Sequence, residues 1–300
     1  MHTSKFFQAT EVSDPLYAKI AKPANRYERK ARRFTQRMWL DCGHLIDADA
    51  PQRASKHDFY SVWWELYVAY ALSRAGISFV PNERPKAKRK GRPDLLAENP
   101  RVWIEAVMPQ SGDGLDALTQ PPLGQVYTVP LDGIILRLIT AIRSKATIVE
   151  GYIEEGTISP SDATVIAVSA GRLPISCRFI GYPVPDPVRA ILGVGHLTMD
   201  LDVETRKLIG RSIQPSAQVL KKSGHAVRTD FFLQKESERV SAVLWSDSDC
   251  VNYEPVPGSD FILVHNPNAR VPLPKTWLPV GRQYSLEGDK LRCDAATPRD

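Results

Sequence analysis

RPDLLAENPRVWIEAV, residues 92–107, contains two apolar runs that meet at a turn. The runs 93–97 and 102–108 have the length and side-chain content of β-strands, and Glu98-Asn99-Pro100 between them is typical of a tight turn. A hairpin of this kind brings Asp94 and Glu105 to neighbouring backbones. Because side chains alternate along a strand, Glu105 shares one face of its strand with Trp103 and Val107.

The segments on either side of this hairpin predict an α/β core with a mixed central sheet. Residues 57–75, HDFYSVWWELYVAYALSRA, are apolar nearly all round, which favours a buried helix that ends at Gly76. Ile77–Val80 is typical of a short strand. A helix capped by Asp132 and running to Glu155 is expected next, followed by a strand over Ala163–Ser169. The predicted order is helix, three strands, helix, strand, with three regions: 1–56, 57–171 and 172–300.

The two flanking regions differ in character. Residues 1–56 are polar and basic, and we expect an irregular arm with one helix near 25–39. Residues 172–300 are β-rich, with strands expected at 188–192, 226–233, 239–246 and 261–265 and a short helix near 203–210. No clear linker precedes this half, so we expect it to extend the sheet of the core.

The composition excludes several classes of protein. The chain has 300 residues, of which 43% are hydrophobic and 24% charged, as in globular proteins. No apolar run reaches the roughly 18–20 residues of a membrane helix. The start, MHTSKFFQATEV, lacks an apolar signal segment, and the four cysteines form no C-x-x-C pair. These features favour a cytoplasmic protein without a disulfide framework.

The net charge of +5 is concentrated in two clusters. Between Lys19 and Arg37, basic residues that include Arg29 and Arg33 recur at helical spacing, so a helix would place them on one face. The second cluster precedes Asp94 and is punctuated by proline and glycine, as in a loop. Its basic residues are Arg84, Lys86, Lys88, Arg89, Lys90 and Arg92. Such clusters bind phosphate backbones, although solvated surface charge is an equally ordinary explanation for the first.

Three acids stand out as candidates for a metal site. Glu65 is the one charged residue between Asp58 and Arg74 in a helix expected to be buried, and a buried carboxylate needs a partner. Asp94 and Glu105 lie on the paired strands. Carboxylates that converge at a sheet edge suit a hard cation such as Mg²⁺ or Mn²⁺, which can activate water against a phosphodiester.

These residues resemble the PD-(D/E)xK nuclease superfamily, which has the restriction-endonuclease-like fold with an αβββαβ core. The resemblance covers roughly residues 57–170. It implies that Asp94, Glu105 and the backbone carbonyl of Ala106 bind the metal and that Glu65 assists them. It also implies a DNA substrate and is compatible with a homodimer.

The sequence departs from the superfamily pattern at one position. Where the E-x-K motif requires lysine, this chain has Val107, which can neither orient water nor neutralise charge. Gln110 could orient water if Pro109 ends the strand, because strict alternation would point it to the opposite face from Glu105. Lys145, on the second core helix, could supply an ammonium group from another element.

Simpler explanations exist for each of these residues. Glu65 could pair with a core arginine such as Arg137 or Arg143, Asp94 could cap a turn, and Glu105 could be a solvated strand residue. Lysines such as Lys145 usually face solvent.

Two functions of different classes follow. The first is a metal-dependent endonuclease or exonuclease acting on DNA, and the second is an inactive nuclease-fold protein that binds nucleic acid or a protein partner. A scaffold in which residues 172–300 mediate assembly is a weaker third hypothesis.

Overall fold

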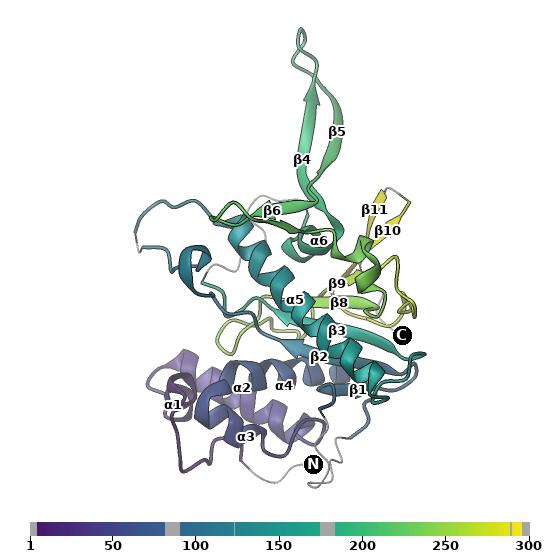
Figure 1. Cartoon of the computed structure of the whole chain (residues 1–300). Coiled ribbons are helices and arrows are strands. Elements are labelled where there is room, and N and C mark those ends of the chain that lie inside the picture. Colours follow the sequence, from purple (N-terminus) through teal and green to yellow (C-terminus); the bar gives the residue numbers. More distant parts are fainter. Residues whose placement is uncertain (1–4, 82–90, 123, 175–183, 289, 296–300) are drawn as a thin grey trace.

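A computed structural model describes residues 5–81, 91–122, 124–174, 184–288 and 290–295 (Figure 1). A seven-stranded mixed sheet runs through the described part of the chain, in the order β1-β2-β3-β8-β9-β10-β11. The strands are β1 (Leu95–Ala97), β2 (Val102–Val107), β3 (Ala163–Ser169), β8 (Ala242–Ser246), β9 (Ile262–His265), β10 (Arg282–Glu287) and β11 (Lys290–Ala295). The predicted fold class, an α/β core extended by a β-rich C-terminal half, is confirmed.

The core strands combine antiparallel and parallel pairing. β1 runs antiparallel to β2, while β2 and β3 are parallel, as are β3 and β8. The short strand expected at Ile77–Val80 is reduced to one bridge, between Phe79 and Ala97, flanked by backbone hydrogen bonds at Val80 and Glu98. The order of the core is thus helix, two strands, helix, strand, and the first of the three strands expected between the helices is not formed.

Helices cover both faces of the sheet. On one face lies α4 (Phe59–Arg74), preceded by a π-helical turn over Ala54–Asp58, with α1 (Pro15–Ala21), α2 (Arg26–Cys42) and α3 (Ala50–Arg53) around it (Figure 1). On the other face lie α5 (Leu131–Glu154) and α6 (Asp186–Leu192). Alternate residues of the strands enter the two cores: Ile104 and Val165 face α4, whereas Ile166 and Val243 face α5 and α6.

Trp64 ties α4 to the sheet by a polar contact as well as by packing. Its side chain is fully buried, and its indole Nε1 donates to the Ala167 carbonyl of β3 at 2.9 Å. A buried indole N–H needs such a partner. The tryptophans at 63, 64 and 103 are core residues, as their ordinary role predicts.

The N-terminal region is not an irregular arm. Helix α2 confirms the helix expected near 25–39, but α1, α3 and the π-helical turn pack with it against α4. Phe6 and Trp39 are buried with ring centroids 5.6 Å apart. Residues 5–58 are thus part of the helical layer, and buried aromatic side chains hold them there. The many basic residues of this segment made it look polar in the sequence, although they lie on its surface.

Three further expectations are wrong. Residues 188–192 lie in α6 and not in a strand, and residues 203–210 belong to a hairpin and not to a helix. This hairpin joins β4 (Val194–Leu201) to β5 (Leu208–Pro215). Its neighbours β6 (Gln218–Leu220) and β7 (Ala226–Arg228) form a second small ribbon. The third wrong expectation concerns the start of α5: Asp132 is not its N-cap but lies in its first turn, and the N-cap is Pro130.

The remaining described elements are short 3-10 turns at Gly114–Asp116, Phe231–Leu233 and Lys235–Ser237. None of the helices in the described ranges is long and apolar enough to cross a membrane.

Gly281 controls the entry into β10, and its replacement tests the sheet extension. Its φ is +77°, and a Cβ would lie 2.2 Å from the Phe261 carbonyl oxygen, the acceptor of the Arg282 amide. We expect Gly281→Ala to lower the free energy of unfolding by about 3 kcal/mol, combining left-handed strain with a backbone clash. Chemical denaturation measures this loss.

Gly288 supplies the matched control. It has a φ of +59° with nothing within 4 Å of a Cβ, so Gly288→Ala should lose only about 1 kcal/mol from strain. Equal losses in the two variants would contradict the close approach at Gly281.

Candidate functional site

Asp94 and Glu105 come together where β1 begins beside β2. The register pairs Leu95 with Ile104, so its continuation would place Asp94 opposite Glu105. Instead of a ladder bond, the amide of Ala106 donates to Asp94 Oδ2 at 2.7 Å. The acids therefore occupy adjacent positions on neighbouring strands, as the hairpin prediction required.

Pro93 explains why the ladder stops there. The same register would pair Pro93 with Ala106, and proline has no N–H to donate to that partner. The Asp94 carboxylate takes the place of the backbone acceptor. Because the N–H and C=O of one strand residue point to the same side, the Ala106 carbonyl also faces the end of β1.

Both carboxylates belong to the face of the sheet that α5 covers. Leu96 and Trp103 pack with Val149 of α5, and Asp94 and Glu105 are each two residues from one of them. Alternation along each strand places all four side chains on this face.

Lys145 of α5 meets Glu105 directly. Its Nζ lies 2.6 Å from Glu105 Oε1, and the side chains are 21% and 6% exposed. Burial lowers the pKa of Lys145, but the negative charges of Glu105, Asp94 and Glu65 outweigh it and raise the pKa above its ordinary value. The lysine is thus held in its charged form among the three acids selected from the sequence.

Glu65 enters the same cluster from α4. Arg53 donates to its Oε2 at 2.8 Å, and the residue is 7% exposed. Burial, followed by the negative charge of Asp94, raises the pKa of Glu65 to about 8, against the opposing effect of Arg53. Among the acids around Glu65, Asp94 contributes most to this shift in pKa.

The partner of Glu65 is not one of the arginines weighed from the sequence. Arg143 pairs with Glu236 at 2.8 Å, and Arg137 donates to the Asp116 carbonyl. Arg53 was missed because it lies outside the two basic clusters. The buried carboxylate predicted that a cation was needed, but the identity of that cation depends on how α3 packs against α4.

Gln110 takes a different position from the other candidates. Strand β2 ends at Val107, before Pro109, and Gln110 is exposed. Val107 is half-buried and packs against the core under α5 and α6. Of the two proposed substitutes for the missing lysine, Lys145 is therefore the one that contacts a candidate metal ligand.

Only some of the candidate nucleic-acid-binding residues lie in the part of the chain that the structure describes. Arg84, Lys86, Lys88, Arg89 and Lys90 lie outside them, whereas Arg92 is described and half-buried. On α2, Arg29 and Arg33 are exposed, while Ala31, Thr35 and Met38 on the opposite side are buried. The helix thus presents the basic face that its spacing predicted.

The charge of the cluster depends on the proton of Glu65. With Glu65 protonated, as its pKa of about 8 favours at neutral pH, the charges of Asp94 and Glu105 balance those of Arg53 and Lys145; loss of that proton gives the cluster one surplus negative charge. Within the described ranges, no three His, Cys, Asp or Glu residues converge closely enough to enclose a metal. Mg²⁺ needs no such enclosure, because it commonly binds one or two carboxylates and completes its shell with water and phosphate oxygens.

Comparison with known proteins identified no relative. No family model matches the chain, and neither the curated proteins nor the solved structures contain a match.

The raised pKa of Glu65 predicts a pH dependence of stability. Its pKa of about 8 in the folded chain lies above the ordinary value of 4.5, so the folded state holds a proton that the unfolded chain has lost. Stability should therefore fall as the pH rises through this window, by about 1.4 kcal/mol for each unit of difference in pKa. Glu65→Gln should flatten this fall, as measured by denaturation between pH 5 and 8.

Glu150→Gln is a suitable control, because Glu150 is exposed on α5 and away from the cluster. If wild type and Glu65→Gln lose stability in parallel with rising pH, the inferred proton on Glu65 is wrong.

Proposed function

We propose that the chain is a metal-dependent nuclease that hydrolyses phosphodiester bonds of DNA, as an endonuclease or exonuclease. The observation that carries this proposal is the convergence of Asp94, Glu105 and Lys145 at the start of β1. Lys145 supplies, from α5, an ammonium group beside the Glu105 carboxylate at 2.6 Å. This is the group that Val107 cannot supply.

The residues that would hold Mg²⁺ or Mn²⁺ are Asp94, Glu105 and the carbonyl of Ala106. Bound there, the ion would polarise a phosphate oxygen and lower the pKa of an attacking water. The fit rests on hard oxygen donors and on the raised pKa of Glu65, which a further cation would lower.

The remaining residues divide the work of phosphoryl transfer. Lys145 can donate hydrogen bonds to the phosphate as negative charge develops on its oxygens. Glu65, with a pKa near 8, is poised to exchange a proton around neutral pH. Arg53 holds the Glu65 carboxylate in place at 2.8 Å. In the hydrolysis, water forms the new P–O bond, the bond to the leaving sugar oxygen breaks, and that oxygen receives a proton.

A non-cleaving nucleic-acid or protein-binding chain is the second candidate. The observation that favours it is Val107 itself, because a lysine supplied from another element has to reproduce the position of the missing one. In that case the Lys145–Glu105 pair would be a structural ion pair that holds α5 on the sheet.

A cleavage assay separates the two candidates. We expect supercoiled plasmid or single-stranded DNA to be cut in the presence of Mg²⁺ or Mn²⁺. Asp94→Ala and Lys145→Met should each lower the rate by at least about 100-fold, the usual contribution of a positioned charged group. Asp132→Asn, at an exposed position in the first turn of α5, should retain full activity.

Folding is controlled separately in this assay. Lys145→Met leaves the Glu105 carboxylate buried without its ammonium partner, so unfolding curves accompany the rates, and Glu105→Gln with Lys145→Met should recover stability without activity. Binding of DNA without cleavage under either metal would exclude the nuclease and support the second candidate.

The basic face of α2 predicts how affinity depends on salt. Each lysine or arginine that contacts a phosphate adds about one unit to the slope of log affinity against log salt. We expect Arg29→Gln with Arg33→Gln to reduce this slope by about two units for a fluorescent duplex in EDTA.

Lys275→Gln with Arg292→Gln is the charge-matched control, since both residues are paired with Glu287 at the far end of the sheet. An equal change of slope in the two double variants would show that net charge, and not the face of α2, determines binding.

A further inference from the structure

The exposed side of α2 carries aromatic rings among its basic residues. Helical spacing places Arg26, Lys30 and Arg33 on the side away from the core, and Tyr27 and Phe34 lie along its flank. Tyr27 and Phe34 are seven residues apart, so they follow one line along the helix, about 10 Å apart along its axis. Tyr27 is 55% exposed, and the guanidinium carbon of Arg26 lies 4.7 Å from the centroid of its ring.

A residue from a distant part of the chain adds another ring to this side. Tyr253, between β8 and β9, stacks on Phe34 with ring centroids 4.1 Å apart and ring planes inclined by 12°. Lys30 Nζ lies 4.7 Å from the centroid of the Tyr253 ring, and both stacked rings are partly exposed. Two pairs of a cation and a ring therefore line the same side of α2. The residues of this α2 face are Arg26, Tyr27, Lys30, Arg33, Phe34 and Tyr253.

No ion pair among the described residues neutralises the positive charge of the α2 face. Glu28, the one acid in the first half of the helix, is 5% exposed, and its carboxylate accepts the Ala24 amide at 2.6 Å. Arg37, one turn beyond Arg33, is paired with Asp41 at 3.8 Å. The cations nearer the start of α2 are thus available to an anionic partner.

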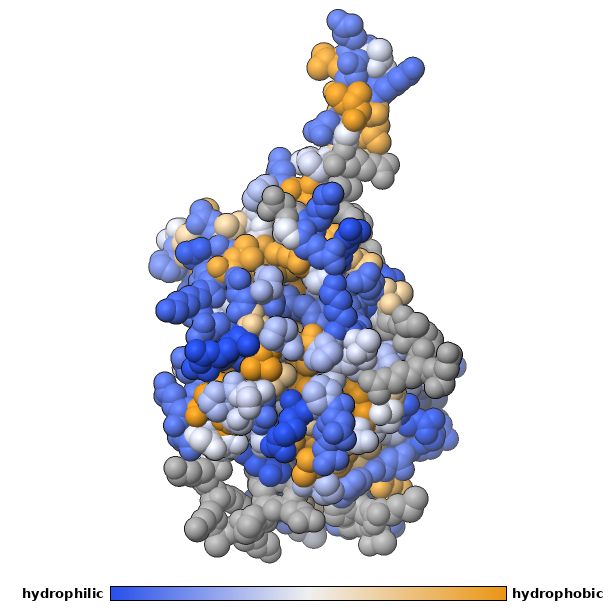
Figure 2. Space-filling view, turned by 90° about the vertical axis from the view of Figure 1, so that its right-hand side faces the viewer, coloured by the Kyte–Doolittle hydropathy of each residue, from blue (hydrophilic) through white to orange (hydrophobic). Residues whose placement is uncertain are grey.

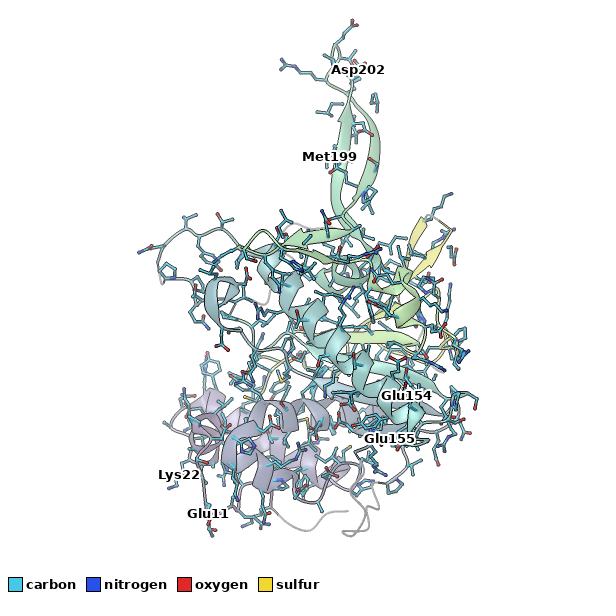
Figure 3. The ribbon with its side chains drawn as sticks, viewed as in Figure 1. Glu11, Lys22, Glu154, Glu155, Met199 and Asp202 are labelled. Carbon is cyan, nitrogen blue, oxygen red and sulfur yellow. The ribbon has the colours of Figure 1, made fainter. Side chains whose placement is uncertain are left out.

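Other parts of the surface differ from the α2 face. Figure 3 shows Glu154 and Glu155, at the acidic end of α5, far from Lys22, which precedes α2 by four residues. Hydrophobic residues gather on the β4–β5 ribbon, which projects at the top of Figure 2. Residues 194–215 of this ribbon include no Phe, Trp or Tyr, and their three acids balance three arginines and lysines. The ribbon therefore lacks the rings and the positive excess of the α2 face.

The combination of rings and cations distinguishes single strands from duplexes. The cations attract the phosphates of either form. In a duplex the bases stack on one another, and their faces are closed to the protein. A single strand can place its bases on aromatic rings and on guanidinium planes. Exposed rings beside available cations therefore favour an unpaired strand.

We propose that the α2 face binds single-stranded nucleic acid, with bases stacked on Tyr27 and Tyr253 and phosphates bound by Arg26, Lys30 and Arg33. The inference rests on the proposed function in that the bound strand would be the substrate of the candidate site. Binding itself requires neither metal nor cleavage, so it is measured with both absent.

Fluorescence anisotropy in EDTA tests the proposal with labelled oligo-dT, oligo-rU and a DNA duplex of equal length. We expect a single strand, of DNA or of RNA, to bind with a Kd at least about fivefold below that of the duplex at the same salt concentration. The difference between the two single strands distinguishes DNA from RNA as the ligand.

Tyr27→Leu separates stacking from charge. It removes the ring and keeps every cation, so the Kd for the preferred single strand should rise at least about fivefold while the Kd for the duplex stays unchanged. Tyr27→Phe is the matched control and should bind like the wild type, because its ring can still stack. Tyr27 is exposed, so neither variant should disturb the fold.

Photo-cross-linking locates the bound base directly. An oligonucleotide that contains 5-iodouracil forms adducts under ultraviolet light with an aromatic side chain on which the base stacks. Mass spectrometry should find these adducts at Tyr27 or Tyr253.

Three results would overturn the proposal. They are equal affinity for single strand and duplex, equal losses in Tyr27→Leu and Tyr27→Phe, and adducts confined to residues outside the α2 face. Tighter binding of a single strand without cleavage in Mg²⁺ or Mn²⁺ would support the proposal and contradict the nuclease.

Discussion

The contact between Lys145 Nζ and Glu105 Oε1, at 2.6 Å, is the interaction on which the candidate site depends. Glu105 lies in the middle layer of the fold, where an ionised carboxylate is costly unless a cation accompanies it. The lysine that supplies this cation also fixes the position of α5 over β2. One ion pair thus links the chemistry of the cluster to the packing of helix on sheet, and Arg53 plays the same part for Glu65 on the other side.

Local features of the sequence predicted the part of the fold that holds the site. The β1–β2 hairpin, α4, α5 and β3 have patterns that agree with their burial, because each is long or sharply bounded. Helix α6 was wrongly expected to be a strand because all of its residues are buried, which removes the helical period from the pattern. Its signals were punctuation alone: Pro187 in the first turn and Gly193, with a φ of +65°, after the last.

The residues of the candidate site likewise differ in whether local sequence or tertiary packing brings them together. Asp94 and Glu105 are joined by a tight hairpin, so their proximity follows from the turn and the register between them. The cations come from distant segments, Arg53 before α4 and Lys145 on α5, and only tertiary packing selects them from the many basic residues of the chain. A buried acid in the sequence predicts that a cation must accompany it, but the sequence alone does not identify that cation.

Because β1 begins only at Leu95, no described strand pairs with Ala106 on that side of β2. Had the ladder continued past Leu95, the backbone groups of Ala106 would have been consumed by pairing. Pro93 prevents this because it lacks an N–H, and the Asp94 carboxylate accepts from the Ala106 amide at 2.7 Å. Pro93 and Asp94 therefore act together: the proline stops the pairing of β1 with β2, and the aspartate carboxylate accepts the hydrogen bond of the Ala106 amide instead. In a regular ladder the Ala106 carbonyl would have accepted a hydrogen bond from the neighbouring strand and would not be available to the proposed cation.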